Sequence, residues 1–99
     1  MNFSVVIDPG AIQDIQQAIN YYDEQQPGLG VRFEAALNKH LTTLQKNPFY
    51  RVRYDNVRCL PLRKFPYMVH FTVDESQKIV AIRAVFHTSL SPKNWKERK

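Results

Sequence analysis

The spacing of the apolar residues changes from a helical period to alternation near residue 50, and this change constrains the fold of the 99-residue chain more than any other feature. Residues 3–7 form a short run rich in β-branched side chains, which is typical of a strand. Asp8 and Pro9 follow as an N-cap and a first helical residue. Apolar residues then recur at helical spacing and predict two helices, over residues 9–25 and 28–46.

Beyond residue 50 the alternation predicts strands over residues 51–54, 58–63, 66–73 and 78–87, and then a helical tail over residues 93–99. Pro61 interrupts the second of these strands, which indicates an edge or a bulge. The last strand is the most apolar and is expected to lie inside the sheet. We therefore predict a single α+β domain over residues 1–99. It has an N-terminal strand, a helical hairpin, a four-stranded, largely antiparallel run of sheet with helices on one face, and a short C-terminal helix.

Several classes of protein are disfavoured by the composition. The single cysteine, Cys59, leaves no partner for an internal disulfide. No apolar run approaches the roughly 20 residues that span a bilayer, and the N-terminus lacks the basic region of a signal peptide, so we expect a cytoplasmic protein. The chain has no glycine-rich phosphate loop, no CxxC motif and no histidine pair at metal-ligand spacing. No cofactor and no metal are therefore expected.

Positive charge is concentrated in the second half of the chain. The net charge is +5, and it divides into −2 for residues 1–49 and +7 for residues 50–99. Such a gradient favours an anionic partner, which could be a nucleic acid or an acidic protein. A generally basic, solvated surface would account for the charge equally well.

The two faces of the last predicted strand differ in the charged residues that they hold. We expect Ile82, Ala84 and Phe86 to pack on the helices, because strand residues two apart share a face. Arg83 and His87 would then lie together on the open face of the sheet. The alternative is that such strand residues form a solvated face or pair with acids.

Other basic side chains are expected to join Arg83 and His87 on this open face. They come from the neighbouring strands and turn, and they are Arg58, Arg63, Lys64 and His70. Such a collection suits the binding of phosphate groups. It also suits RNA cleavage, which needs a base, an acid and cations near the phosphate. In a nuclease the catalytic residues would be Arg83 and His87, and the residues that bind nucleic acid or an acidic partner would be Arg58, Arg63, Lys64 and Arg83.

Two stretches of the chain resemble the RelE/ParE superfamily of toxins from type II toxin–antitoxin systems. The first is Arg63 to Phe71, which contains a basic residue, Phe-Pro-Tyr and an apolar strand. The second is Val80 to His87 with the residues Pro92, Trp95 and Arg98 after it, which resembles the family's strand, histidine and Pro-x-x-Trp-x-x-Arg tail. The predicted order of elements is similar to the family's over nearly the whole chain.

This resemblance implies a bacterial toxin that arrests growth, is associated with plasmid stabilization and is neutralised by an acidic antitoxin. RelE-like members cut messenger RNA on the ribosome, whereas ParE-like members inhibit DNA gyrase. By position in the family pattern, Arg58 matches a basic residue of the second sheet strand, and His87 lies near the basic or histidine position that ends the last strand.

Two residues depart from the RelE-like pattern, because Tyr67 and Leu90 stand where many relatives have arginine. Both departures remove charge expected at phosphate, and the Phe-Pro-Tyr motif leans toward ParE. We therefore expect action on DNA gyrase. The alternatives are a ribosome-dependent endoribonuclease with His87 as acid or base, and an inactive member that only binds its antitoxin.

Overall fold

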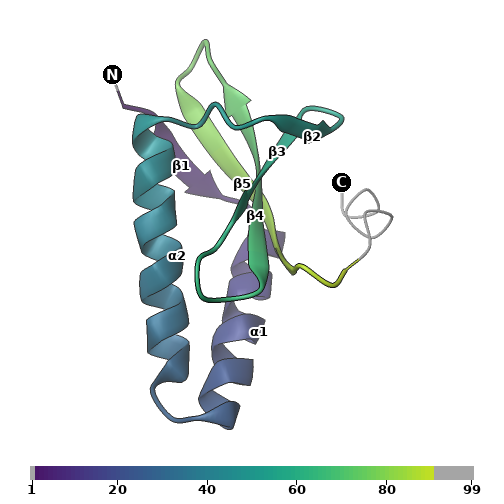
Figure 1. The fold of residues 1–99 in the computed structure, drawn as a ribbon. Coiled ribbons are helices and arrows are strands. Elements are labelled where there is room, and N and C mark those ends of the chain that lie inside the picture. The colour runs from purple at the N-terminus through teal and green to yellow at the C-terminus, as the bar shows by residue number, and fades with distance from the viewer. Residues whose placement is uncertain (1, 91–99) are drawn as a thin grey trace.

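A five-stranded sheet and a helical hairpin make up residues 2–90, which are the residues that the computed structural model describes (Figure 1). In chain order the elements are β1 (Ser4–Ile7), α1 (Pro9–Gln25), α2 (Leu29–Lys46), β2 (Val52–Tyr54), β3 (Val57–Pro61), β4 (Tyr67–Asp74) and β5 (Ile79–His87). The strand order in the sheet is β1-β5-β4-β3-β2. Among the strands of the described residues, only the pairing of β1 with β5 is parallel.

The predicted α+β class and the order of its elements are confirmed over the described residues. The N-terminal strand joins the same sheet and raises its strand count to five. As predicted, β5 lies inside the sheet, between β1 and β4. The helix predicted over residues 93–99 lies outside the described residues. None of the helices among residues 2–90 is both long and apolar enough to cross a bilayer.

The helical hairpin is closed by two glycines with different roles. Gly28 has a φ of 89°, in the left-handed region that glycine adopts without strain. Gly30 lies so close to α1 that a Cβ there would be 2.6 Å from the carbonyl oxygen of Ile19. The amide of Gly30 also donates to Oδ1 of Asp23 at 2.8 Å. The start of α2 is therefore fixed against the last turns of α1.

Both helices pack on one face of the sheet and form the main core with it. The buried members of this core are Phe3, Ala11, Ala18, Phe33, Leu37, Leu41, Leu44, Leu60, Leu62, Val69, Phe71, Val80, Ile82 and Val85. A smaller cluster lies on the opposite face, with Cys59, Met68, Ala84 and Phe86 buried in it. Residues of β5 thus contribute to both clusters.

A one-residue bulge in β5 explains this division and contradicts the simple alternation predicted for the strand. Val69 pairs with Val85, and Phe71 pairs with Ile82, so three residues of β4 lie opposite four of β5. Arg83 is the additional residue. Ile82 and Val85 therefore both face the helices, whereas Ala84 and Phe86 face away from them. The prediction that Ala84 and Phe86 pack on the helices is wrong.

Beyond the bulge, β5 has no β1 residue beside it. The parallel pairing of β1 with β5 ends at Ile7 and Ile82. The amide of Val85 donates instead to Oδ2 of Asp14, at 3.0 Å. A carboxylate of α1 thus satisfies a partly buried backbone donor that the sheet leaves open. This contact fixes α1 across the end of the sheet.

Candidate functional site

Arg83 connects the sheet to the start of α1. Its Nη1 lies 2.8 Å from Oδ2 of Asp8, and its Nε donates to Oγ1 of Thr72 at 3.1 Å. Thr72 lies between Phe71 and Val73, which both pack against the main core, so Arg83 is held on the face away from the helices. Asp8 has no side-chain capping bond to α1, although it occupies the predicted N-cap position. Its carboxylate pairs with Arg83 instead.

His87 lies on the other face of the sheet. It is the cross-strand partner of Tyr67, and the two ring centroids are 5.2 Å apart. Tyr67 packs against the main core, and its ring also contacts Phe33. Nδ1 of His87 accepts a hydrogen bond from the amide of Ser89 at 3.0 Å. The expectation that Arg83 and His87 share an open face is therefore wrong, because the bulge places them on opposite faces.

His70 lies on the face away from the helices, as expected, but it is fully buried there. Its Nδ1 is 3.0 Å from the hydroxyl of Tyr54 and 3.4 Å from Sγ of Cys59. Burial, with a smaller contribution from Arg53, lowers the pKa of His70 to about 4, against an opposing effect of Asp14. His70 is thus a neutral residue inside the second cluster and does not join a cationic surface.

Cys59 and Tyr54 of this cluster are neutral at physiological pH as well. Burial raises the pKa of the Cys59 thiol to about 11, and it raises the pKa of Tyr54 to about 12. A nucleophilic cysteine needs the thiolate form. These side chains are therefore packed core residues and do not form a reactive centre.

Arg58 lies on the opposite face of the sheet from Arg83. It is the cross-strand partner of Phe71, which faces the helices. The guanidinium carbon of Arg58 lies 5.4 Å from the centroid of the Phe49 ring, just beyond the end of α2. Its Nη1 is buried and has no hydrogen-bond partner among the described residues. Arg58 and Arg83 therefore cannot bind one phosphate together.

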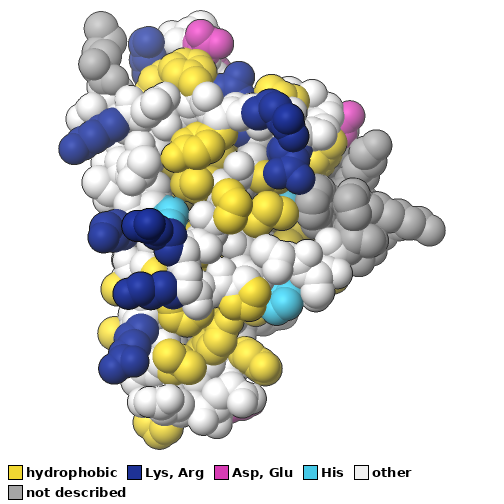
Figure 2. All heavy atoms as spheres, viewed as in Figure 1, with side chains coloured by type: hydrophobic (Ala, Val, Ile, Leu, Met, Phe, Trp, Pro, Cys, Tyr) yellow, Lys and Arg dark blue, Asp and Glu magenta, His cyan; other side chains and the backbone are white. Residues whose placement is uncertain are grey.

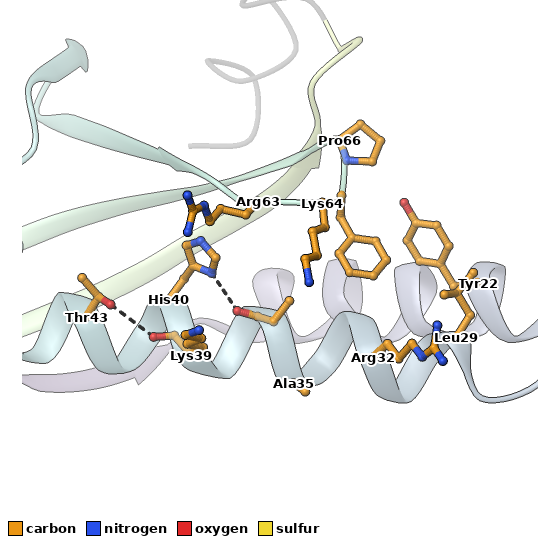
Figure 3. A pocket seen from close by; sticks show the side chains of 12 residues that line it. Tyr22, Leu29, Arg32, Ala35, Lys39, His40, Thr43, Arg63, Lys64 and Pro66 are labelled. Atoms are coloured by element: carbon orange, nitrogen blue, oxygen red, sulfur yellow. Dashed lines mark hydrogen bonds between the residues drawn. The ribbon is translucent and has the colours of Figure 1, made fainter.

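Arg63 and Lys64 are brought together with α2 and not with Arg83. Both lie exposed in the turn between β3 and β4, where Lys64 has a φ of 70°. The turn lies over α2 and encloses a groove of about 980 Å³ with it. We call this the α2 groove; its lining residues are Tyr22, Leu29, Arg32, Ala35, Ala36, Lys39, His40, Thr43, Arg63, Lys64, Phe65 and Pro66 (Figure 3).

The α2 groove is basic, and no acid occurs among the lining residues that the structure describes. Arg32 and Lys39 of α2 are seven residues apart, and Lys46 follows after another seven, so all three lie along one side of the helix. Lysine and arginine side chains gather along this edge of the molecule (Figure 2). The sequence also indicates this basic region, because residues 32–64 have eight basic residues against two acidic ones. Dividing the net charge between residues 1–49 and 50–99 does not reveal it.

The described residues contain no group of three or more histidine, cysteine, aspartate or glutamate side chains that could hold a metal ion. His40, which lines the α2 groove, has its Nδ1 2.7 Å from the carbonyl oxygen of Ala36 in its own helix. Within residues 2–90, the chemistry available at the groove is therefore cationic and aromatic.

Comparison with known proteins identifies the family. Residues 5–91 match the family described as the ParE toxin of the type II toxin–antitoxin system parDE. The chain belongs to the ParE toxin family. It is therefore a toxin of a type II toxin–antitoxin system, as the resemblance of its motifs predicted. No curated protein matches the chain significantly.

Solved structures share the fold of this ParE-family toxin at low sequence identity. The chromosomal ParDE system of P. aeruginosa is similar with a TM-score of 0.78 and 18% identity, over 88% of this chain and 97% of that chain. A double arginine-to-alanine mutant of E. coli RelE has a TM-score of 0.68 and 16% identity, over 99% and 95%. RelBE2 of Mycobacterium tuberculosis has a TM-score of 0.60 and 16% identity, over 88% and 99%. Both branches of the superfamily thus share this fold.

Proposed function

We propose that this ParE-family toxin arrests growth from the cytoplasm by inhibiting DNA gyrase, and that a cognate antitoxin neutralises it. The observation that supports gyrase over messenger RNA as the target is the separation of Arg83 and His87 by the sheet. General acid–base cleavage needs its proton-transferring groups within hydrogen-bond reach of one substrate. Residues 2–90 do not bring these two side chains to one surface.

The environment of the candidate catalytic residues supports the same proposal. Arg83 pairs with Asp8, so part of its charge is already compensated. His70 is buried and neutral, and His87 packs on Tyr67. An inhibitor that acts by binding needs no such pair. The role of Arg83 and His87 as catalytic residues belongs to the alternative, a RelE-like ribosome-dependent nuclease.

The proposal of an antitoxin partner is supported by charge and by the solved relatives. RelBE2 of Mycobacterium tuberculosis is described as a toxin–antitoxin complex, as is the intact RelBE of E. coli. The excess of basic residues between positions 32 and 64 would attract an acidic antitoxin segment. Arg58, Arg63 and Lys64 belong to this excess and are proposed as binding residues.

Purified chain added to gyrase and relaxed plasmid should stop supercoiling or cause cleaved gyrase–DNA complexes to accumulate. The same chain should leave messenger RNA intact in a translating extract. The variant His87→Ala should inhibit gyrase within about threefold of the parent chain, because no proton transfer is involved. A nuclease that uses this histidine would lose roughly 10²- to 10⁴-fold in rate. Cleavage of messenger RNA by the parent chain, lost in His87→Ala, would contradict the proposal.

A further inference from the structure

The cations of the α2 groove have no compensating charge within residues 2–90. Among residues 2–90, none of Arg32, Lys39, Arg63 and Lys64 forms an ion pair, and all four are exposed. Figure 3 shows Lys64 reaching from the turn toward α2, and His40 projecting from α2 toward Arg63. Solvated cations that line two sides of one groove attract a polyanion without the cost of breaking ion pairs.

The spacing of these cations suits a chain of phosphates. Arg32 and Lys39 are seven residues apart on α2, a separation of about 10.5 Å along the helix axis. A stacked nucleic-acid strand advances about 3.4 Å for each nucleotide. Cations about 10.5 Å apart therefore face every third phosphate. The groove follows α2 from Leu29 to Thr43, about 21 Å, which is room for about six stacked nucleotides.

Aromatic rings form one end of the groove floor. Tyr22 and Phe65 both line the groove and are half-buried, with their ring centroids 5.1 Å apart. Each ring also packs on Phe33, at 5.5 Å and 5.3 Å respectively, so both are held in fixed positions. Rings held at the edge of a cationic groove are what unpaired bases stack on. A duplex has its bases stacked inside and cannot use such a floor.

We propose that the α2 groove binds a single strand of nucleic acid. Its phosphates are held by Arg32, Lys39, Arg63 and Lys64, and the rings of Tyr22 and Phe65 receive one or two bases. This binding site lies on the α2 side of the molecule, away from Arg83, and goes beyond the inhibition of gyrase. The shared chemistry of DNA and RNA single strands, a phosphodiester chain with free base faces, is what the groove recognises.

The test measures fluorescence anisotropy of labelled octanucleotides, one DNA and one RNA, with the purified 99-residue chain. Binding of either octamer is expected to weaken roughly 50-fold between about 50 and 200 mM salt, the dependence for four phosphate contacts on a single strand. A DNA duplex of the same sequence should bind at least about fivefold more weakly, because it cannot stack on the rings.

Two double variants of equal net charge locate the site. Lys39→Gln with Lys64→Gln removes two groove cations and should weaken octamer binding roughly tenfold while halving its dependence on salt. Arg51→Gln with Lys78→Gln removes two exposed cations outside the groove lining and should change binding less than threefold. The variant Phe65→Leu should weaken binding about 5- to 150-fold and leave the salt dependence unchanged. Thermal unfolding followed by circular dichroism confirms that each variant is folded.

Three results would overturn the proposal. The first is the absence of octamer binding at about 50 mM salt. The second is an equal loss of binding in both double variants, which would mean that binding depends on the total charge of the chain and not on the groove. The third is equally tight binding of polyglutamate or of the duplex, which would make the groove a general acidic-partner surface. None of these results depends on whether the chain inhibits gyrase, so the two proposals fail separately.

Discussion

A chain that lacks Ala84 should lose at least about 4 kcal/mol of its free energy of unfolding, whereas a chain that lacks Arg83 should lose no more than about 2 kcal/mol. The two deletions leave sequences that differ at a single position. One has arginine, and the other has alanine, between Ile82 and Val85. Both Ile82 and Val85 face the helices, so the residue between them faces the second cluster.

The difference follows from what that position can hold. Ala84 is only 2% exposed and lies opposite His70 in the ladder. An arginine there buries a charge beside a neutral histidine and overfills a packed cluster, and both effects are costly. Deletion of Arg83 itself removes the bulge and the partly exposed contact with Asp8, which contributes about 0–1 kcal/mol. All later residues keep their faces.

Urea unfolding of the two deletion chains measures this difference directly. A strand without a bulge would give the opposite pattern for Arg83, because its deletion would turn Val85 and Phe86 to the wrong faces. If the chain lacking Arg83 does not fold, or if both deletions cost the same, then the bulge does not lie at this residue.

The second large effect is a loss of stability in acid through His70. Its pKa is lowered from 6.5 to about 4 by burial, so the folded chain resists a proton that the unfolded chain already binds below about pH 6.5. The neutral, buried His70 therefore contributes its full share to the free energy of unfolding above pH 6.5, and this contribution is lost as the pH falls from 6.5 to 4. The shift corresponds to roughly 3 kcal/mol.

A His70→Gln variant isolates this contribution, because glutamine retains a polar group but cannot be protonated. We expect the free energy of unfolding of the parent chain to fall about 3 kcal/mol more than that of the variant between pH 7 and 4. The carboxylates contribute similarly to both chains and cancel in the difference. Equal acid sensitivity of the two chains would show that His70 is not held neutral by the second cluster.

The helices and the order of the strands could be predicted because their signals are local. Pro9 starts α1, Gly28 begins the turn into α2 with a positive φ, and each helix has an apolar stripe. The bulge could not be predicted, because Arg83 is neither glycine nor proline and the apolar residues on both sides allow unbroken alternation. Its cause is tertiary: Val80, Ile82 and Val85 all bury against the helices.

Arg63 and Lys64, which are expected from the sequence to be binding residues, are exposed cations in the α2 groove. Their partners Arg32 and Lys39 were overlooked, because apolar spacing defines a helix's buried side, whereas these cations lie on its outer side. Only the fold shows that the turn between β3 and β4 lies over that side. His70 was placed on the correct face, but its burial depends on packing that alternation does not describe.

The two departures from the RelE-like pattern have structural roles in this chain. Tyr67 packs against the main core, where its ring contacts Tyr22, Phe33 and His87. Leu90 packs against the second cluster. Apolar contact thus replaces the charge expected at both positions, and this agrees with the proposal that the toxin acts by binding.

The register of β4 against β5 places Arg83 and His87 on opposite faces of the sheet. Cross-strand nuclear Overhauser contacts measure that register. The structure predicts backbone contacts for the pairs Val69–Val85 and Phe71–Ile82, with Arg83 skipped between them. An unbroken ladder, in which Phe71 lies opposite Arg83 while Val69 still faces Val85, would put Arg83 and His87 on one face and contradict this account.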